Sequence, residues 1–390
     1  MFCDLTDSQR ALRDELRAYF SGLLSPGERA TLLTERHGIV YRDVVRRMGN
    51  DGWLGVAWPP EYGGRGLGQV EQQIFVSEAA RADVPLPAVT LQTVGPVLQA
   101  NGTAGQKEFF LPRILAGEVH FAIGYTEPEA GTDLASLRTR AVRDGDNYLV
   151  NGEKIFTTGG HDADYIWLAC RTDAGAPKHK GISILIVGTA DPGFSWTPIT
   201  THDGAHHTNA TYYSDVRVPA SSLVGSENGG WPLITNQLNH ERVALTSAAP
   251  ILTALREVTA WARETRLASG QRVIDSEWVQ VSLARVHAKA EFLKLTNWRI
   301  ASAAGAGLGP AAASATKVFG TEFATEAYRL LMEVLGANAA VRDGSPGAVL
   351  AGRIERMHRS ALILTFGGGT NEVQRDIVAA AALGLPISRR

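Results

Sequence analysis

The stretch Ile123-Gly-Tyr-Thr-Glu-Pro-Glu-Ala-Gly-Thr-Asp133 stands where the character of the chain changes, with helical patterning before it and alternating strand patterning after it. Pro128 and Gly131 exclude a regular helix or a central strand at this point. The stretch is therefore predicted to be a loop with free backbone N–H groups and the hydroxyls of Thr126 and Thr132. Such a loop can surround a polar, planar, partly anionic cofactor, whereas a shorter Thr-Glu-Pro run would indicate only a turn between domains.

The composition narrows the class of protein. The chain has 390 residues, 44% hydrophobic and 20% charged, with a formal net charge of −2. This length allows two or three large cores, and the near-neutral charge gives no reason to expect a nucleic acid or membrane partner. Cys3 and Cys170 lack metal-ligand spacing and are typical of a reduced, cytoplasmic protein. The sequence begins without a signal-peptide pattern, and no apolar run reaches the roughly 20 residues of a membrane helix.

Apolar residues at helical spacing mark the N-terminal region. The helices expected there are residues 4–24, 42–51, 69–81, 91–100 and 103–116. The glycine-rich run 53–68 lacks both the strand-to-helix frame of a dinucleotide fingerprint and the Lys-Ser/Thr of a P-loop. We therefore interpret it as a structural connection.

Short strands separated by turn signals follow between residues 121 and 225, which predicts a small antiparallel sheet or barrel. Turns are expected at Asp144-Gly145 and Asn151-Gly152, and a strand at 153–158. Three histidines, His202, His206 and His207, have no cysteine or acidic cluster beside them, so we expect no metal. After Trp231 the pattern is helical again, and long helices expected at 249–268, 275–305, 310–335 and 348–365 suggest a bundle.

Three motifs, together with the order of a helical, a β and a second helical region, resemble the acyl-CoA dehydrogenase family over nearly the whole chain. They are Tyr125 to Asp133, Lys154-Ile-Phe-Thr-Thr158 and Gly369-Thr-Asn-Glu-Val-Gln-Arg375. Thr132 replaces the usual serine and keeps the hydroxyl, and Phe156 stands at the usual tryptophan. The resemblance implies the α+β fold of that family. It comprises an N-terminal helical domain at 1–119, a middle antiparallel β domain at 120–225 and a C-terminal four-helix bundle at 226–390.

The resemblance also implies a reaction, the FAD-dependent α,β-dehydrogenation of an acyl-CoA thioester. A base removes the α-proton while the β-hydrogen leaves as hydride to flavin N5. Thr126 would lie on the pyrimidine side of the flavin, Thr158 near its N5 and O4 edge, and Phe156 along the ring face, although an ordinary core aromatic would also suit Phe156. The full set of implied cofactor contacts is Ile123, Tyr125, Thr126, Gly131, Thr132, Phe156, Thr158, Arg266, Thr370 and Glu372.

Glu241 is the expected base. The α-proton is too weakly acidic for a carboxylate in water, so the site needs donors to the thioester oxygen and a desolvated carboxylate of raised pKa. Many family members carry that carboxylate directly before the C-terminal Gly-Thr, where this chain has Gly368. Isovaleryl- and long-chain-type members instead carry it within a Glu-Arg pair on the first bundle helix, which matches Glu241-Arg242. Glu241 also lies on an apolar stripe between Leu238 and Leu245. A salt-bridged surface glutamate is the alternative.

Substrate contacts are implied at three positions. Asn239 occupies the position of the CoA-contacting aspartate, and Thr132 is expected to touch the pantetheine chain. Arg242 would orient the glutamate or the loop on the flavin side.

The chain departs from homotetrameric members where these complete the FAD site of a neighbouring subunit. Arg266 is retained, but Ser269 replaces an aromatic residue, and Glu277 and Glu333 replace two glutamines. Two carboxylates near a pyrophosphate should repel it. We therefore expect an α2β2 heterotetramer with a homologous subunit, and the chain looks most like the subunits of actinobacterial steroid side-chain degradation. The implied substrate is a steroid CoA ester, and the implied electron acceptor is an electron-transferring flavoprotein. A flavin acyl-CoA oxidase and a non-catalytic scaffold subunit are the alternatives.

Overall fold

The computed structural model describes residues 4–244, 246–303, 309–342 and 344–386, without the side chains of residues 34 and 238–244. Contacts divide the chain into two compact units. The first unit comprises Met1–Ser21, Gln69–Val84 and Arg242–Arg390, and the second comprises Gly22–Gly68 and Pro85–Glu241. Each unit is described by itself.

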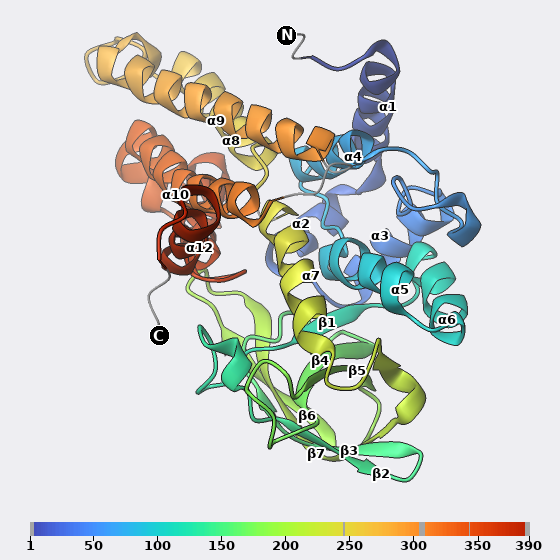
Figure 1. Cartoon of the computed structure of the whole chain (residues 1–390). Coiled ribbons are helices and arrows are strands. Elements are labelled where there is room, and N and C mark those ends of the chain that lie inside the picture. Colours follow the sequence, from blue (N-terminus) through green and yellow to red (C-terminus); the bar gives the residue numbers. More distant parts are fainter. Residues whose placement is uncertain (1–3, 245, 304–308, 343, 387–390) are drawn as a thin grey trace. The chain divides into compact units, whose positions relative to one another are not determined.

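The second unit contains an eight-stranded sheet (Figure 1). The strand order is β6-β7-β3-β2-β4-β5-β8, and β1 pairs with β4 beside this path. The sheet is mainly antiparallel, as predicted, but β1 runs parallel to β4, and β2 meets β4 in a single parallel pair. The strands are β1 (Phe121–Gly124), β2 (Arg140–Asp144), β3 (Asn147–Lys154), β4 (Tyr165–Arg171), β5 (Ile182–Gly188), β6 (Phe194–Thr200), β7 (His206–Pro219) and β8 (Leu223–Val224).

The turn predicted at Asn151-Gly152 is wrong, because β3 continues through it as a β-bulge. The register of β3 against β7 shifts between Val150 and Gly152. Gly152 has φ +148°, and a Cβ added there would lie 2.7 Å from the Cα of Thr139. The close approach of Thr139, the residue before β2, therefore requires glycine at this position. The strand predicted for 153–158 ends at Lys154, and the residues after it form a loop.

The helices of the second unit come before and after these strands in the sequence. They are α2 (Pro26–Thr34), α3 (Ile39–Asn50), a π-helix (Val89–Val94) continued by α5 (Gly95–Asn101), α6 (Ala104–Leu115) and α7 (Gly230–Ala244), whose last three residues belong to the first unit. The sequence analysis missed α2, which begins with a capping box. The Ser25 hydroxyl accepts a hydrogen bond from the Glu28 backbone, and the Glu28 carboxylate accepts one from the Ser25 backbone.

The first unit is helical, and its core lies between α8, α9 and α10, where Val258, Val286 and Leu331 are fully buried. Its helices are α1 (Asp7–Leu23), whose last two residues belong to the second unit, α4 (Gln69–Arg81), α8 (Ala249–Glu264), α9 (Glu277–Ala303), α10 (Pro310–Leu335), α11 (Arg353–Ala361) and α12 (Asn371–Leu383). The helix predicted at 348–365 is shorter, because Leu350 and Ala351 have left-handed backbone and separate the start of that range from α11. Within the part of the chain described here, no helix is long and apolar enough to cross a membrane.

Candidate active site

The stretch after β1 is a loop, as predicted, and it opens with a tight turn. Glu127 and Ala130 exchange two backbone hydrogen bonds, of 3.2 and 3.1 Å, around Pro128-Glu129. Beyond the turn, Gly131 and Thr132 are exposed. The second half of the loop therefore presents a glycine backbone and a hydroxyl at the surface of its unit.

A buried ion pair between Lys154 and Glu127 holds the loop in place. Lys154 at the end of β3 is 1% exposed, and its Nζ donates to the Glu127 carboxylate at 2.8 Å and to the Tyr125 carbonyl at 2.9 Å. The Glu127 carboxylate also accepts the backbone N–H groups of Arg138 and Thr139, at 2.6 and 2.8 Å. Burial alone would raise the pKa of Glu127, but Lys154 and these N–H groups hold the pKa below its usual value. Both ends of the loop are thus tied to one charged centre.

Phe156 does not lie in the core. Its ring is 56% exposed, and its backbone is left-handed with φ +61°, a conformation that costs a non-glycine residue about 1 kcal/mol. The neighbouring Thr157 is fully buried, whereas Thr158 is exposed. The Ile155 N–H donates to the Thr126 carbonyl at 2.8 Å, which brings this segment against the loop. The second unit therefore presents an aromatic ring and a threonine hydroxyl beside Thr126.

Tyr125 joins the loop to β4 and α7. Its side chain is buried, and its hydroxyl donates to Oε1 of Gln237 at 2.5 Å. The indole N–H of Trp167, a residue opposite Ile123 in the parallel β1–β4 pair, lies 3.1 Å from both the Tyr125 hydroxyl and Gln237 Oε1. Half-buried Ile123 therefore lies on β1, next to the hydrogen bonds among Tyr125, Trp167 and Gln237.

The backbone of the predicted base lies on α7, but the position of its side chain is not described. Positions 239, 241 and 242 fall within the helix Gly230–Ala244, as the sequence predicts. The side chains of Asn239, Glu241 and Arg242 lie outside the described residues. Their roles as substrate contacts and base therefore stay predictions.

The C-terminal motif surrounds the start of α12 in the first unit. Thr370 caps the helix, and its hydroxyl accepts the Val373 N–H at 3.4 Å. Glu372 in the first turn is exposed, and its own backbone N–H and next the Thr370 hydroxyl hold the pKa of this carboxyl below its usual value. The carboxamide of buried Asn371 accepts a hydrogen bond from Nζ of fully buried Lys317 at 2.7 Å. The same ammonium donates to the carbonyl before the cap, and so fixes the loop from inside.

Gly368 has left-handed backbone, with φ +68°. A glutamate at this position, where many family members carry the base, would be strained in this backbone. The first unit therefore lacks a carboxylate at this position, and its local conformation disfavours one.

Arg266 is exposed in the turn after α8. Its guanidinium donates to the Gly270 carbonyl at 2.7 Å. Exposed Glu277 is the first residue of α9, where a carboxylate stabilises the N-terminus of the helix. Glu333 forms an ion pair with Arg329, one turn away on α10. These residues have ordinary local partners, and whether they complete a neighbour's cofactor site stays a prediction.

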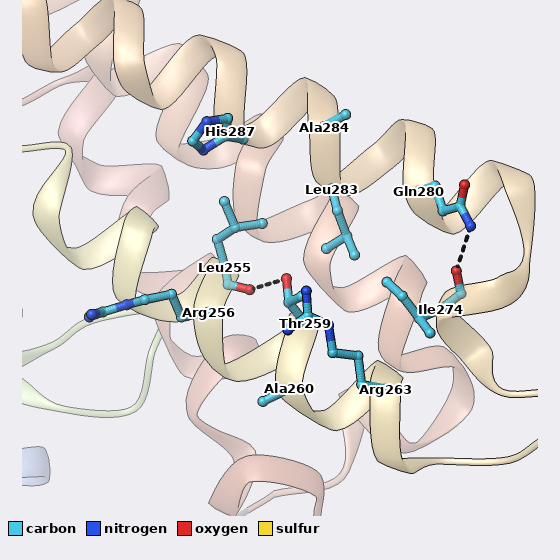
Figure 2. A pocket seen from close by; sticks show the side chains of 10 residues that line it. All are labelled: Leu255, Arg256, Thr259, Ala260, Arg263, Ile274, Gln280, Leu283, Ala284 and His287. Atoms are coloured by element: carbon cyan, nitrogen blue, oxygen red, sulfur yellow. Dashed lines mark hydrogen bonds between the residues drawn. The ribbon is translucent and has the colours of Figure 1, made fainter.

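A shallow hollow of about 600 Å³ lies between α8 and α9, and Figure 2 shows its ten lining residues. None of them is a residue assigned to cofactor or substrate. Thr259 donates to the Leu255 carbonyl at 2.6 Å, and the Gln280 amide donates to the Ile274 carbonyl at 3.0 Å. The lining contains no carboxylate, so it offers no base for removing an α-proton. The hollow is therefore not our candidate active site.

Histidines gather at a different place in the second unit. The His161 ring stacks on His206 with centroids 4.2 Å apart and meets His37 at 4.9 Å, and the His37 ring lies 6.3 Å from His207. Burial, and next the charge of His161, lower the pKa of His37 to about 4. The described residues contain no group of three or more histidine, cysteine or acidic side chains arranged to hold a metal ion.

The residues present fit a flavin on the second unit. A loop of fixed shape, two hydroxyls and an exposed aromatic ring held by strained backbone lie together there. Glu127 and Lys154, which hold these groups, were not predicted as functional residues, although both stand within the motifs. The signal was present, because Lys154 falls on the inward face of β3 in phase with buried Tyr148 and Val150, where a lysine requires a buried partner.

The chain matches three family models of acyl-CoA dehydrogenases. The N-terminal domain matches residues 6–118, the middle domain 122–216 and the C-terminal domain 228–383. It is 60% identical to acyl-CoA dehydrogenase FadE26 of Mycobacterium tuberculosis over 396 aligned positions, covering 99% of each chain. It is also 60% identical to acyl-CoA dehydrogenase FadE29 of the same organism, again with 99% of each chain covered.

Solved structures agree with these sequence relationships. A chain in the crystal structure of the ChsE4-ChsE5 complex from Mycobacterium tuberculosis superposes with a TM-score of 0.94 at 60% identity, over 100% of both chains. A chain of the Tcur3481-Tcur3483 steroid acyl-CoA dehydrogenase superposes with a TM-score of 0.93 at 51% identity, also over 100% of both. The predicted fold is confirmed, and the chain belongs to the acyl-CoA dehydrogenase family.

Proposed function

We propose that this acyl-CoA dehydrogenase oxidises the α,β-bond of a CoA thioester with FAD as cofactor and Glu241 as the base. The observation that carries the proposal is the loop 125–133, fixed by the Glu127–Lys154 pair and flanked by the exposed ring of Phe156. An exposed aromatic ring on left-handed backbone, beside a loop that a buried ion pair fixes, supports a surface that receives a flat ligand. In this proposal the cytoplasmic chain has three domains, with boundaries near residues 119 and 225.

The chain's own groups divide the work of binding. Thr126, Thr132 and Thr158 would donate or accept hydrogen bonds at the polar edge of the flavin, and Phe156 would cover part of its face. Ile123, Tyr125 and Gly131 would shape the loop, while Arg266, Thr370 and Glu372 would serve the remaining cofactor groups. Bound FAD would supply the acceptor for the hydride from the β-carbon.

Glu241 would take the α-proton in place of a carboxylate at position 368. Burial of the α7 face around it is supported by Ile234, two turns earlier on the same stripe, which is fully buried. A desolvated carboxylate has a raised pKa and is a stronger base. Asn239 and Thr132 would bind the CoA chain, and Arg242 would orient the glutamate.

A single substitution tests the base. Glu241→Gln is expected to keep its flavin and to lose most of the bleaching of the flavin by acyl-CoA, because the amide cannot accept the proton. Glu264→Gln at the exposed end of α8 is the matched control and should bleach normally. Near-normal bleaching by Glu241→Gln would remove the proposed base. Gly368→Glu, compared with Gly368→Ala to separate backbone strain, asks whether a carboxylate at the other family position can rescue Glu241→Gln.

We also propose that the chain acts with a homologous subunit in an α2β2 complex and takes a steroid CoA ester. Support comes from the two similar structures described above, one named as a two-protein complex and the other as a two-protein steroid enzyme. Support also comes from α9, where Trp278, Val281, Phe292 and Leu295 are 53%, 61%, 55% and 45% exposed. Their spacing places them on one face of the helix, with exposed Arg285 among them, and a partner chain would cover this largely apolar face.

Co-expression tests the partner. The chain purified alone is expected to contain little FAD, and the complex with the homologous subunit to be fully loaded. One FAD per subunit in the lone chain would contradict the heterotetramer. A panel of acyl-CoA and steroid CoA esters, scored by flavin bleaching, then identifies the substrate class, and reduction of an electron-transferring flavoprotein identifies the acceptor. Peroxide release during turnover would instead indicate an oxidase, and a complex whose bleaching survives Glu241→Gln would make this chain a scaffold.

A further inference from the structure

Gln237 on α7 is a buried polar residue that none of the proposed roles uses. Its side chain is 1% exposed, and both Tyr125 and Trp167 direct hydrogen atoms at its Oε1. The indole N–H of Trp167 can only donate. The carboxamide oxygen must therefore face Tyr125 and Trp167, and the orientation of the amide follows from its partners.

The other end of this carboxamide is unsatisfied. Among the described residues, none accepts a hydrogen bond from Gln237 Nε2, although the atom is buried. Buried amide groups in folded proteins almost always find a partner, since an unmade hydrogen bond forfeits the solvation of the group. Two N–H donors are thus held in a fixed direction without an internal acceptor.

The position of Gln237 connects it with the candidate active site. Tyr125, which donates to the carboxamide oxygen of Gln237, belongs to the loop 125–133 and directly precedes Thr126. On α7, position 241 follows one turn after position 237, a rise of about 6 Å along the same helix face. Gln237 is therefore joined through Tyr125 to the loop proposed for the flavin, and it lies one helical turn before the position proposed for the base.

We propose that Gln237 is a fixed hydrogen-bond donor to a carbonyl oxygen of the bound ligand, and so a specificity-determining residue of the site. The inference rests on the proposed function, because it takes the ligand to be FAD or an acyl-CoA. Both present amide-like or carbonyl oxygens of the kind that a carboxamide N–H binds. Tyr125 and Trp167 are positioning residues, since they orient the carboxamide without meeting the ligand through their own donors.

The test measures binding and not turnover. Gln237→Glu keeps an oxygen for Tyr125 and Trp167 and removes the amide donors. Gln237→Met removes the donors in every protonation state. Asn236→Asp makes the same amide-to-carboxylate change at the neighbouring exposed position of α7 and is the matched control. Each variant is purified with the partner subunit, and its affinities for FAD, for CoA and for a 2-enoyl-CoA are measured by calorimetry, with circular dichroism as the check of folding.

Both Gln237 variants are expected to bind one of these probes at least about tenfold more weakly than wild type, because a ligand oxygen loses its buried donor. Loss with FAD identifies a flavin carbonyl, loss with CoA a pantetheine amide, and loss with the enoyl-CoA alone an oxygen of the acyl group. Affinities within twofold of wild type for all three probes, in either folded variant, would overturn the proposal. Bleaching by Glu241→Gln, measured alongside, would remove the base but leave the binding result for Gln237 unaffected.

Discussion

Replacing Lys154 by methionine would leave the Glu127 carboxylate buried without its counter-ion. The ammonium makes two hydrogen bonds in the folded chain, to Glu127 at 2.8 Å and to the Tyr125 carbonyl at 2.9 Å, and is shielded from solvent. Removing one partner of a buried ion pair typically costs about 3–5 kcal/mol. Because Glu127 keeps the backbone N–H groups of Arg138 and Thr139, we expect the lower end of this range, about 3 kcal/mol.

The same loop supplies the control. Lys178 pairs with Asp133, also at 2.8 Å, but these side chains are 45% and 54% exposed. An exposed pair contributes about 0–1 kcal/mol, so Lys178→Met should differ little from wild type. The two substitutions delete the same charge from the same kind of pair, and only the burial differs.

The assay is urea unfolding, combined with hydrogen exchange at the amides of Arg138 and Thr139. In the wild type the pKa of Glu127 is lowered, so the pair stabilises the fold above the unfolded-state pKa of about 4.3 and loses this contribution as the pH falls through the folded-state value. In Lys154→Met, burial without a counter-ion raises the pKa of Glu127, so the deficit should shrink below about pH 5. A deficit under 1 kcal/mol at pH 7, equal to that of Lys178→Met, would refute the reasoning.

Two further substitutions follow from the structure. Burial and the neighbouring His161 lower the folded-state pKa of His37 to about 4. The folded chain then prefers the neutral ring, and up to about 3 kcal/mol of stability, present above pH 6.5, should be lost as the pH falls from 6.5 to 4. His37→Gln should flatten this part of the curve of urea midpoint against pH, and an unchanged slope would contradict the assignment. Lys317→Met should strand three oxygen acceptors and destabilise the first unit by at least about 2 kcal/mol in thermal unfolding, whereas Lys294→Met, a partly exposed i,i+3 pair, should change little.

The fold could be predicted from the sequence where one local signal decided it. The helix at 310–335 has the predicted bounds, and its signals, the proline at its first position and the sustained apolar stripe, act within the helix itself. The loop at 125–133 follows from proline and glycine. By contrast, Asn151-Gly152 carries the local signal of a hairpin turn, but pairing of β3 with β7 on one side and contact with Thr139 on the other make it a bulge. That outcome depends on strands distant in the sequence.

The candidate site was predictable in its motifs but not in its supporting contacts. Phe156 was recognised by its place in a motif, and the same position left an ordinary core residue open as the alternative. Only the backbone shows that its conformation is left-handed and its ring exposed. Gln237 was missed because its partners, Tyr125 and Trp167, lie 112 and 70 residues away. No spacing rule within one helix connects these three side chains.

Two buried lysines show what the signature motifs do. Lys154 in the second unit donates to a backbone carbonyl of the first motif and to the carboxylate of Glu127, and Lys317 in the first unit donates to the Gly369 carbonyl and to the carboxamide of Asn371. In each unit a fully buried ammonium therefore holds a loop by its main chain and by one motif side chain. An ammonium is suited to this task because it offers three donors from a single atom, and several oxygens of a loop without regular structure can converge on it. Glu127 and Asn371 therefore support the shape of their loops from inside, and neither side chain is exposed to a ligand. Substituting either residue should alter cofactor retention, because the shape of the loop would change.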